Sequence, residues 1–334
     1  MKWMGRQTLV TRKSDMINAL QRKKARTGDR VPIWEIEFHL WDKFSSRHMV
    51  VGREFQSLTS QEKDCALHIN AEIFCEVSEK LNFTAITLPG GYWEIAVGEP
   101  AYFWLPEEAR FEQIKLLQQM TSDLMLITGA TGTLGIPEAG EFVEFSEKLF
   151  TAPHEIDLLA KERLKNGVES AKKLIDHGID AVYSAADLAD NRSPYYNPEQ
   201  MERFILPCLA EWASKVKKMG AYAILHSDGN LMPCLEKIAF SGVDALQAID
   251  PVAGMDMRKV KDLIGKQICL CGNIDCGLLV TACPEDVYEA TKELLITCKN
   301  GGGLVLGASN ALQQQTPIEN YLAVIAAWEK FGGY

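Results

Sequence analysis

The chain has 334 residues, a hydrophobic content of 47% and a formal net charge of −10. The acidic balance argues against nucleic-acid binding, which needs clustered lysine and arginine, and no stretch approaches the roughly 18 apolar residues of a membrane span. The basic start lacks the apolar core of a signal peptide and the nine cysteines follow no disulfide pattern, so we expect a cytoplasmic protein.

Residues 1–29 are expected to form an N-terminal helical extension. Ser14 and Asp15 would cap a short helix that continues to Arg26, with a glycine shortly after its end. A helix in this position commonly closes the amino-terminal mouth of a barrel. Residues 30–334 contain no linker or low-complexity tract and are expected to form one catalytic domain.

Eight short apolar runs, each ending in a polar or acidic residue, recur along the chain. They cover residues 32–37, 84–89, 124–131, 180–189, 222–230, 244–251, 268–275 and 304–310. Segments with helical periodicity separate most of them, which is typical of parallel strands buried on both faces. The pattern predicts an α/β fold, a single (β/α)8 TIM barrel, whose chemistry lies at the carboxyl ends of its strands.

Helices are expected between these runs. One begins at Ser60, and the others cover residues 107–121, 138–150, 154–177, 198–220, 256–264, 284–299 and 317–331. The polar residues at the strand ends are the candidates for the functional site: Glu35, Glu37, Thr128, Asp187, His226, Asp228, Asp250, Asn273, Asp275 and Asn310.

The strongest motif is the pair His226 and Asp228 at the end of the fifth run. Alternation along a strand places both side chains on one face, where they could share a metal ion or a proton. A purely structural hydrogen bond between the two remains the alternative. By contrast, Cys269 and Cys271 fit a buried strand better than a zinc–sulfur site, because no further thiolates accompany them.

Acidic and aromatic residues gather around the first strands. Glu35 and Glu37 share one strand face and are costly to bury unless they are paired or bound to a ligand. The rings of Tyr92, Trp93 and Tyr196 either cap the barrel or line a pocket for a flat apolar substrate.

The segments HSDGN, GVDALQAIDP, LCGNID, GGGLVLGASN and TPIENYLAVIAAWEKFG resemble the carboxyl-terminal half of the uroporphyrinogen decarboxylase superfamily. A looser resemblance extends over the chain from RVPIWE onward. The superfamily has a (β/α)8 barrel and includes decarboxylases and corrinoid-dependent methyltransferases. The decarboxylases hold a polyanionic substrate with an arginine-rich segment, whereas this chain reads WEIEFHLWDKF there, so porphyrinogen decarboxylation is not expected.

The methyltransferases that act on coenzyme M bind zinc through His-x-Cys and a second cysteine on the last strand. This chain resembles them in His226, but Asp228 and Asn310 stand where the two cysteines would be. Carboxylate and amide oxygens are harder ligands than thiolates, so thiol activation is not expected.

The segments RVPIWEIEFHLWD and NAEIFCEVSEKLNFTAITLPGGYWE resemble methyltransferases that begin the O-demethylation of methyl ethers. That resemblance implies a small-molecule methyl donor, such as a methoxyaromatic, and a partner corrinoid protein whose cobalamin takes the methyl group. It also implies a proton donor or Lewis acid, with zinc as the candidate, on the departing oxygen.

The roles implied are as follows. His226 and Asp228 would hold the metal, Glu35, Glu37 or Asp187 would ligate or protonate, Asn273 and Asn310 would orient the substrate, and Tyr92, Trp93 and Tyr196 would contact its ring. Two alternatives stay open, which are methyl transfer from a methylated corrinoid to a thiol or folate, and a non-catalytic binding role.

Overall fold

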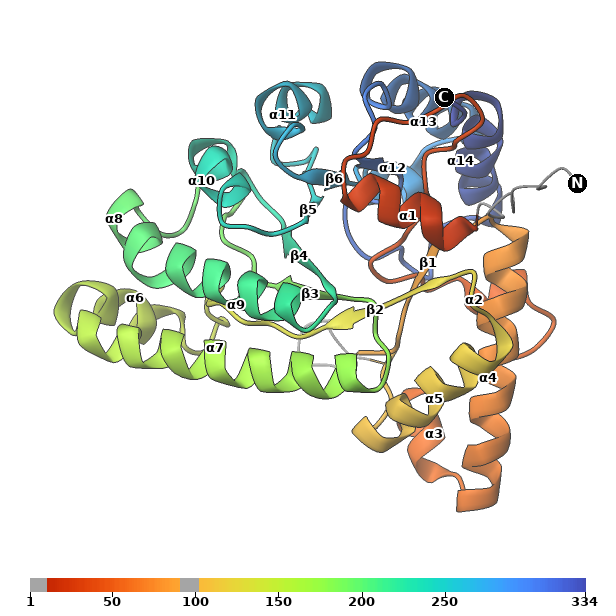
Figure 1. The fold of residues 1–334 in the computed structure, drawn as a ribbon, viewed down its shortest axis with the longest axis horizontal. Coiled ribbons are helices and arrows are strands. Elements are labelled where there is room, and N and C mark those ends of the chain that lie inside the picture. Colours follow the sequence, from red (N-terminus) through yellow and green to blue (C-terminus); the bar gives the residue numbers. More distant parts are fainter. Residues whose placement is uncertain (1–10, 91–101) are drawn as a thin grey trace, which may run out of the picture.

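Seven parallel strands follow one another in chain order around one curved sheet (Figure 1). The computed structural model describes residues 11–90 and 102–334. The strands are β1 (Ala85–Thr87), β2 (Met125–Gly129), β3 (Ala181–Ala185), β4 (Tyr222–Ser227), β5 (Ala245–Ala248), β6 (Cys269–Cys271) and β7 (Leu304–Val305). Each lies within one of the apolar runs that predict strands.

The remaining predicted strand, at 32–37, is present only as a short bridging segment. Ile33 forms isolated parallel bridges with Phe83, beside β1, and with Leu306, beside β7. The Trp34 N–H donates to the Leu306 carbonyl at 3.0 Å, and the Thr84 N–H donates to the Ile33 carbonyl at 2.9 Å. This segment closes the sheet, so the predicted α/β barrel is confirmed. Pro32 lacks an N–H and restricts the ladder at this point.

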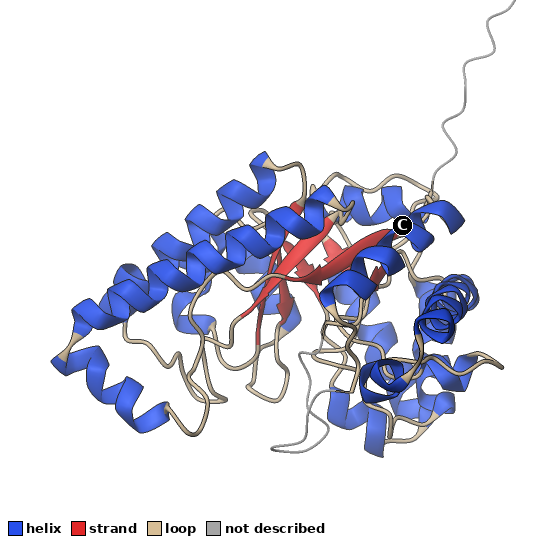
Figure 2. Cartoon of the chain, turned by 90° about the horizontal axis from the view of Figure 1, so that it is seen from below, coloured by secondary structure: helices blue, strands red, loops and turns tan. Residues whose placement is uncertain are grey.

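Helices lie outside the sheet (Figure 2). They are α1 (Arg12–Leu20), α2 (Trp41–Phe44), α3 (Gly52–Ser57), α4 (Ser60–Lys80), α5 (Glu107–Met120), α6 (Phe142–Thr151), α7 (Pro153–Asp176), α8 (Pro198–Gln200), α9 (Leu206–Lys218), α10 (Leu235–Ala239), α11 (Met257–Ile264), α12 (Cys276–Thr281), α13 (Pro284–Cys298) and α14 (Ile318–Phe331). A π-helical turn (Met201–Ile205) joins α8 to α9, and a 3-10 turn (Met232–Cys234) precedes α10. Within the described residues, no helix is both long and apolar enough to span a membrane.

Helix α1 differs from its predicted bounds. Thr11 rather than Ser14 is the N-cap, and the two side chains accept hydrogen bonds from each other's backbone N–H groups. The prediction that the helix reaches Arg26 is wrong, because the chain leaves the helix at Gln21 and Arg22 adopts a positive φ of 51°. Its buried residues Met16, Ala19 and Leu20 pack against side chains from inside the barrel.

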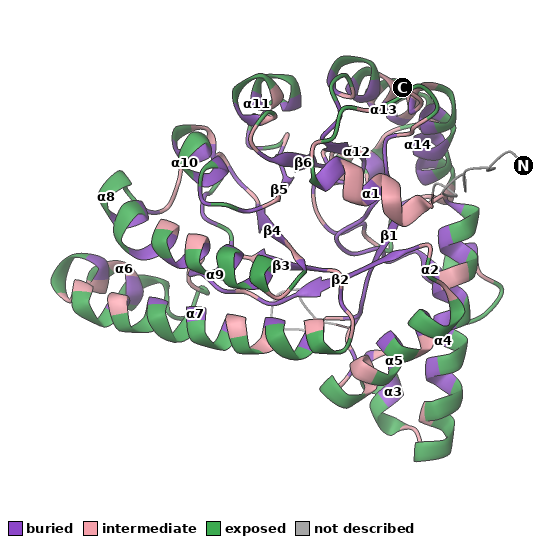
Figure 3. Cartoon of the chain, viewed as in Figure 1, coloured by how far each residue is buried: buried purple, intermediate pink, exposed green. Residues whose placement is uncertain are grey.

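Burial separates the two faces of the strands. Met125 and Ile127 of β2 point into the barrel, whereas Leu124 and Leu126 pack under the outer helices. Figure 3 shows the strands buried along most of their length, while most helices expose one face. Both strand faces are therefore apolar along most of their length, and polar side chains become possible only at the strand ends.

Candidate metal centre at the carboxyl ends of the strands

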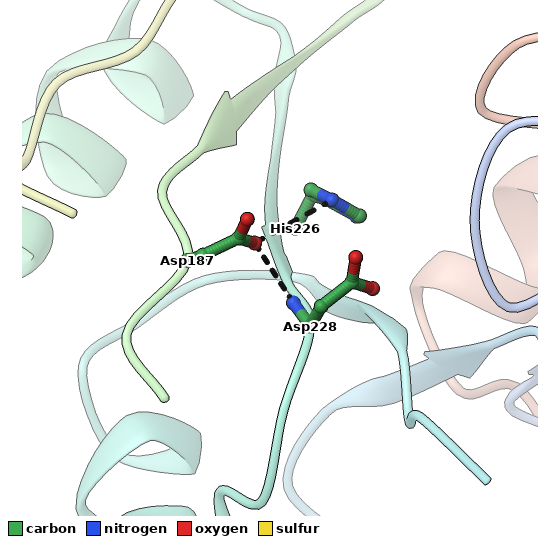
Figure 4. Close-up of side chains that lie close together, drawn as sticks. All are labelled: Asp187, His226 and Asp228. Carbon is green, nitrogen blue, oxygen red and sulfur yellow. Dashed lines mark hydrogen bonds and ion pairs between the residues drawn. The ribbon is translucent and has the colours of Figure 1, made fainter. Parts of the chain in front are cut away.

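Three predicted site residues meet where neighbouring strands end. His226 lies in β4, Asp228 follows β4 directly, and Asp187 follows β3 (Figure 4). Each offers one ligand atom, and these atoms lie within 4.8 Å of one another. The Nε2 of His226 is 3.8 Å from Oδ1 of Asp187, which also accepts the Asp228 backbone N–H at 2.9 Å.

This cluster lines a cavity of about 320 Å³. The lining residues are Ile36, Glu37, Thr131, Tyr183, Ala185, Asp187, His226, Asp228, Asn310 and Ala311. Three of them are acidic, and in the part of the chain that the structure describes none is lysine or arginine. The cavity therefore suits a cation better than an anion.

Gln247 of β5 fixes the orientation of the His226 ring. Its side-chain oxygen contacts Nδ1 of His226, and its amide nitrogen donates to the carbonyls of Ala308 at 3.2 Å and Ser309 at 3.3 Å. Since the amide hydrogens are directed at carbonyl oxygens, the oxygen must accept and Nδ1 of His226 must carry its hydrogen. The Nε2 lone pair is then left facing the cavity, as a metal ligand or base requires.

Replacing Gln247 by leucine is expected to lower the affinity for zinc by about 10- to 100-fold, because the ring loses the acceptor that holds its tautomer. Zinc affinity is measured by competition with a chromophoric chelator. Equal affinities for the leucine variant and the wild type would contradict this role.

Asp228 is an acid of the cluster with a raised pKa. Burial raises the pKa of Asp228 to about 6; the adjacent His226 lowers it, and Asp187 and Asp250 raise it further. The side-chain amide of Asn310 donates to its Oδ2. Asn310 therefore lies beside Asp228 and positions this carboxylate at the cavity wall.

The two predicted glutamates diverge. Glu37 lines the cavity, and its Oε2 is 2.8 Å from Nε2 of His39. Glu35 is not among the lining residues: its two oxygens accept the Ala308 backbone N–H and the Tyr321 hydroxyl, each at 2.8 Å. Its contacts join the first strand segment to the end of β7 and to α14.

Four further predicted residues lie elsewhere or cannot be placed. The Tyr196 hydroxyl donates to the Gly135 carbonyl at 2.6 Å, and the ring packs in the outer core. The Asn273 amide donates to the Ile249 carbonyl at 2.8 Å, away from the cavity lining. Tyr92 and Trp93 lie outside the described residues.

Sequence reasoning did not find Gln247, Thr131 or Tyr183. Gln247 carried a usable signal, since it is the one amide in an otherwise apolar strand, ALQA, and a buried amide needs hydrogen-bond partners. Thr131 and Tyr183 carried none, because threonine and tyrosine are ordinary strand residues.

One imidazole and two carboxylates form a nitrogen–oxygen ligand set. Such a set suits zinc or a similar divalent ion, and three protein ligands leave a position open for substrate, as in catalytic zinc sites. Cys276 is close by, with its Sγ 3.7 Å from the Ser309 hydroxyl, but burial raises the pKa of its thiol to about 11. It therefore stays protonated and adds no thiolate at neutral pH.

Comparison with known proteins gives the following relatives. A family model described as uroporphyrinogen decarboxylase (URO-D) matches residues 111–331, well over half of the chain. Uroporphyrinogen decarboxylase of Coxiella burnetii is 28% identical over 160 residues, 47% of this chain and 42% of that protein. The Anaeromyxobacter dehalogenans enzyme is 30% identical over 159 residues, 47% and 44% of the two chains. The match thus spans less than half the length of these curated relatives.

Among solved structures, a methyltransferase from Methanosarcina mazei superposes with a TM-score of 0.69 at 20% identity, covering 96% of this chain and 99% of the other. A B12-independent methionine synthase from Shewanella superposes with a TM-score of 0.56 at 11% identity, covering 90% and 97%. At these identities the likeness establishes the fold of the chain.

Proposed function

The chain belongs to the uroporphyrinogen decarboxylase family, and from that premise we propose that it is a corrinoid-dependent methyltransferase that cleaves a methyl ether. The observation that carries the proposal is the cluster of His226, Asp187 and Asp228 in the cavity wall. A porphyrinogen with several carboxylates would meet three acids there. A neutral ether with a single ring fits both the charge and the volume of the cavity.

Different side chains have different roles in ether cleavage. His226, Asp187 and Asp228 would hold zinc, which would supply a Lewis acid for the ether oxygen. Asn310 positions Asp228 and the substrate. Ile36 and Tyr183 provide apolar contact for the ring, together with Tyr92 and Trp93 as we propose from the sequence. The methyl acceptor is the cobalt(I) of a corrinoid protein, which would dock over the carboxyl ends of the strands.

The proposal is tested with purified protein, zinc, cob(I)alamin and a panel of methyl donors under anaerobic conditions. Methoxyaromatics are expected to yield methylcobalamin, seen as the change in the visible spectrum, whereas methanol and methylamines are not. Methylamines as the preferred donors would contradict the ether assignment. No product with free cobalamin or with a cognate corrinoid protein would favour methyl transfer to a thiol or folate instead.

A further inference from the structure

A buried acid–base pair, Glu37 and His39, lies between the cavity of the Asp187, His226 and Asp228 side chains and a second cavity. Glu37 and His39 lie in an extended segment that pairs with the chain after β7 through a parallel bridge between Phe38 and Leu312. The His39 N–H donates to the Leu312 carbonyl at 3.0 Å, and the Leu312 N–H donates to the Glu37 carbonyl at 2.8 Å. Alternation then places Glu37 and His39 on one face, while Phe38 enters the aromatic core.

The pair is closely coupled and almost fully enclosed. Oε2 of Glu37 is 2.8 Å from Nε2 of His39, and the side chains are 3% and 2% exposed. The other oxygen, Oε1, is buried and has no hydrogen-bond partner among the described residues. A buried carboxylate oxygen without a donor is costly, so this oxygen is placed for a group that enters the cavity.

The two residues open onto different spaces. Glu37 lines the same cavity as His226 and Asp228, whereas His39 lines a second cavity of about 300 Å³. The wall of the second cavity also includes Trp41, Asp42, Lys43, Tyr102 and Gln314. Asp42 is 46% exposed, so this side of the pair has access to bulk water.

We propose that Glu37 and His39 form a proton relay that delivers a proton to the departing oxygen from the second cavity. The inference rests on the proposed function. The electron pair of cobalt(I) forms the new bond to the methyl carbon as the C–O bond breaks, and the oxygen keeps the electrons of that bond and takes the proton of Glu37. His39 then gives its Nε2 proton to Glu37 and takes one at Nδ1 from water in the second cavity.

The relay predicts a dependence on the leaving group. A poor leaving group, the phenoxide from methoxybenzene, needs the proton, whereas the stabilised oxyanion from 4-nitroanisole does not. In His39→Gln the amide can still donate a hydrogen bond to Glu37, but it cannot relay a proton as the two ring nitrogens of histidine can. We expect it to lower the turnover of methoxybenzene by about 100-fold and that of 4-nitroanisole by no more than about 5-fold.

A second substitution and a control accompany this test. Glu37→Gln should show the same selective loss, and it decides the question if His39→Gln fails to fold. His48→Gln is the matched control, because His48 also contacts two carboxylates, of Asp42 and Glu54, but lies exposed and lines neither cavity. It should leave both rates unchanged.

The outcomes separate the relay from the proposed function. Equal losses for the two ethers, or no loss for either, would overturn the relay while the wild-type turnover upholds the methyltransferase. Absence of wild-type turnover with both ethers would overturn the proposed function and the relay with it.

Discussion

Replacing His226 by alanine is expected to lower the rate of methyl transfer by at least about 1,000-fold, because a Lewis acid on the ether oxygen contributes several kcal/mol to the barrier. The substitution removes the only nitrogen of the Asp187, His226 and Asp228 ligand set. It also leaves the Gln247 oxygen without the ring that contacts it. Zinc content per chain, measured by atomic emission, should fall in parallel with the rate.

The control for this variant is His68→Ala. His68 is exposed on α4, and its Nδ1 contacts the Asp64 carbonyl of its own helix at 2.9 Å. This change should leave both zinc content and rate as in the wild type. A His226→Ala protein that demethylates at the wild-type rate would show that the site formed by Asp187, His226 and Asp228 is not the reaction centre.

The wild type is expected to lose about 3 kcal/mol of its free energy of unfolding as Glu35 ionises with rising pH, and Glu35→Gln should abolish this loss. Glu35 is 4% exposed, and burial raises its pKa from 4.5 to about 7, against the lowering effect of the hydrogen bonds from Ala308 and Tyr321. Below pH 4.5 the carboxyl is protonated in both states. Between pH 4.5 and 7 only the unfolded chain ionises, so the free energy of unfolding falls as the pH rises.

The amide of Glu35→Gln imitates the protonated acid and cannot ionise. Its free energy of unfolding should match the wild type near pH 4 and exceed it near pH 8, as measured by urea denaturation at both values. The exposed Glu162→Gln serves as control, and its free energy of unfolding should fall between the two pH values as much as that of the wild type. A variant less stable than wild type at pH 8 would contradict a raised pKa at Glu35.

Barrel enzymes carry their chemistry at the carboxyl ends of their strands, and this rule predicted the central residues of the candidate site. Apolar runs placed the strands, and the polar residues closing them included His226, Asp228 and Asp187, which the structure brings together. Asn310, which also closes a predicted strand and which the resemblance matches to a ligand position, lies beside Asp228. These placements follow from strand order, because the carboxyl ends of parallel strands share one edge of a barrel.

Side-chain direction could not be predicted in the same way. Glu35 and Glu37 are two residues apart, but their segment forms isolated bridges at Ile33 and Phe38 rather than a regular ladder. Regular alternation is lost between them, so Glu35 turns to Tyr321 and Glu37 to the cavity. Tyr196 is buried in the outer core because the chain after β3 folds back over α6, a matter of tertiary packing. Gln247 acts by orienting His226, and a rule that selects residues at strand ends does not predict such a supporting residue.

The most direct test of the metal-dependent methyltransferase is a single-turnover assay of zinc-depleted protein with cob(I)alamin and methoxybenzene. Methylcobalamin should form only slowly without zinc, and one equivalent of zinc per chain should restore the full rate. An undiminished rate in the zinc-free protein, or no methylcobalamin when zinc and a corrinoid protein are both supplied, would contradict the account.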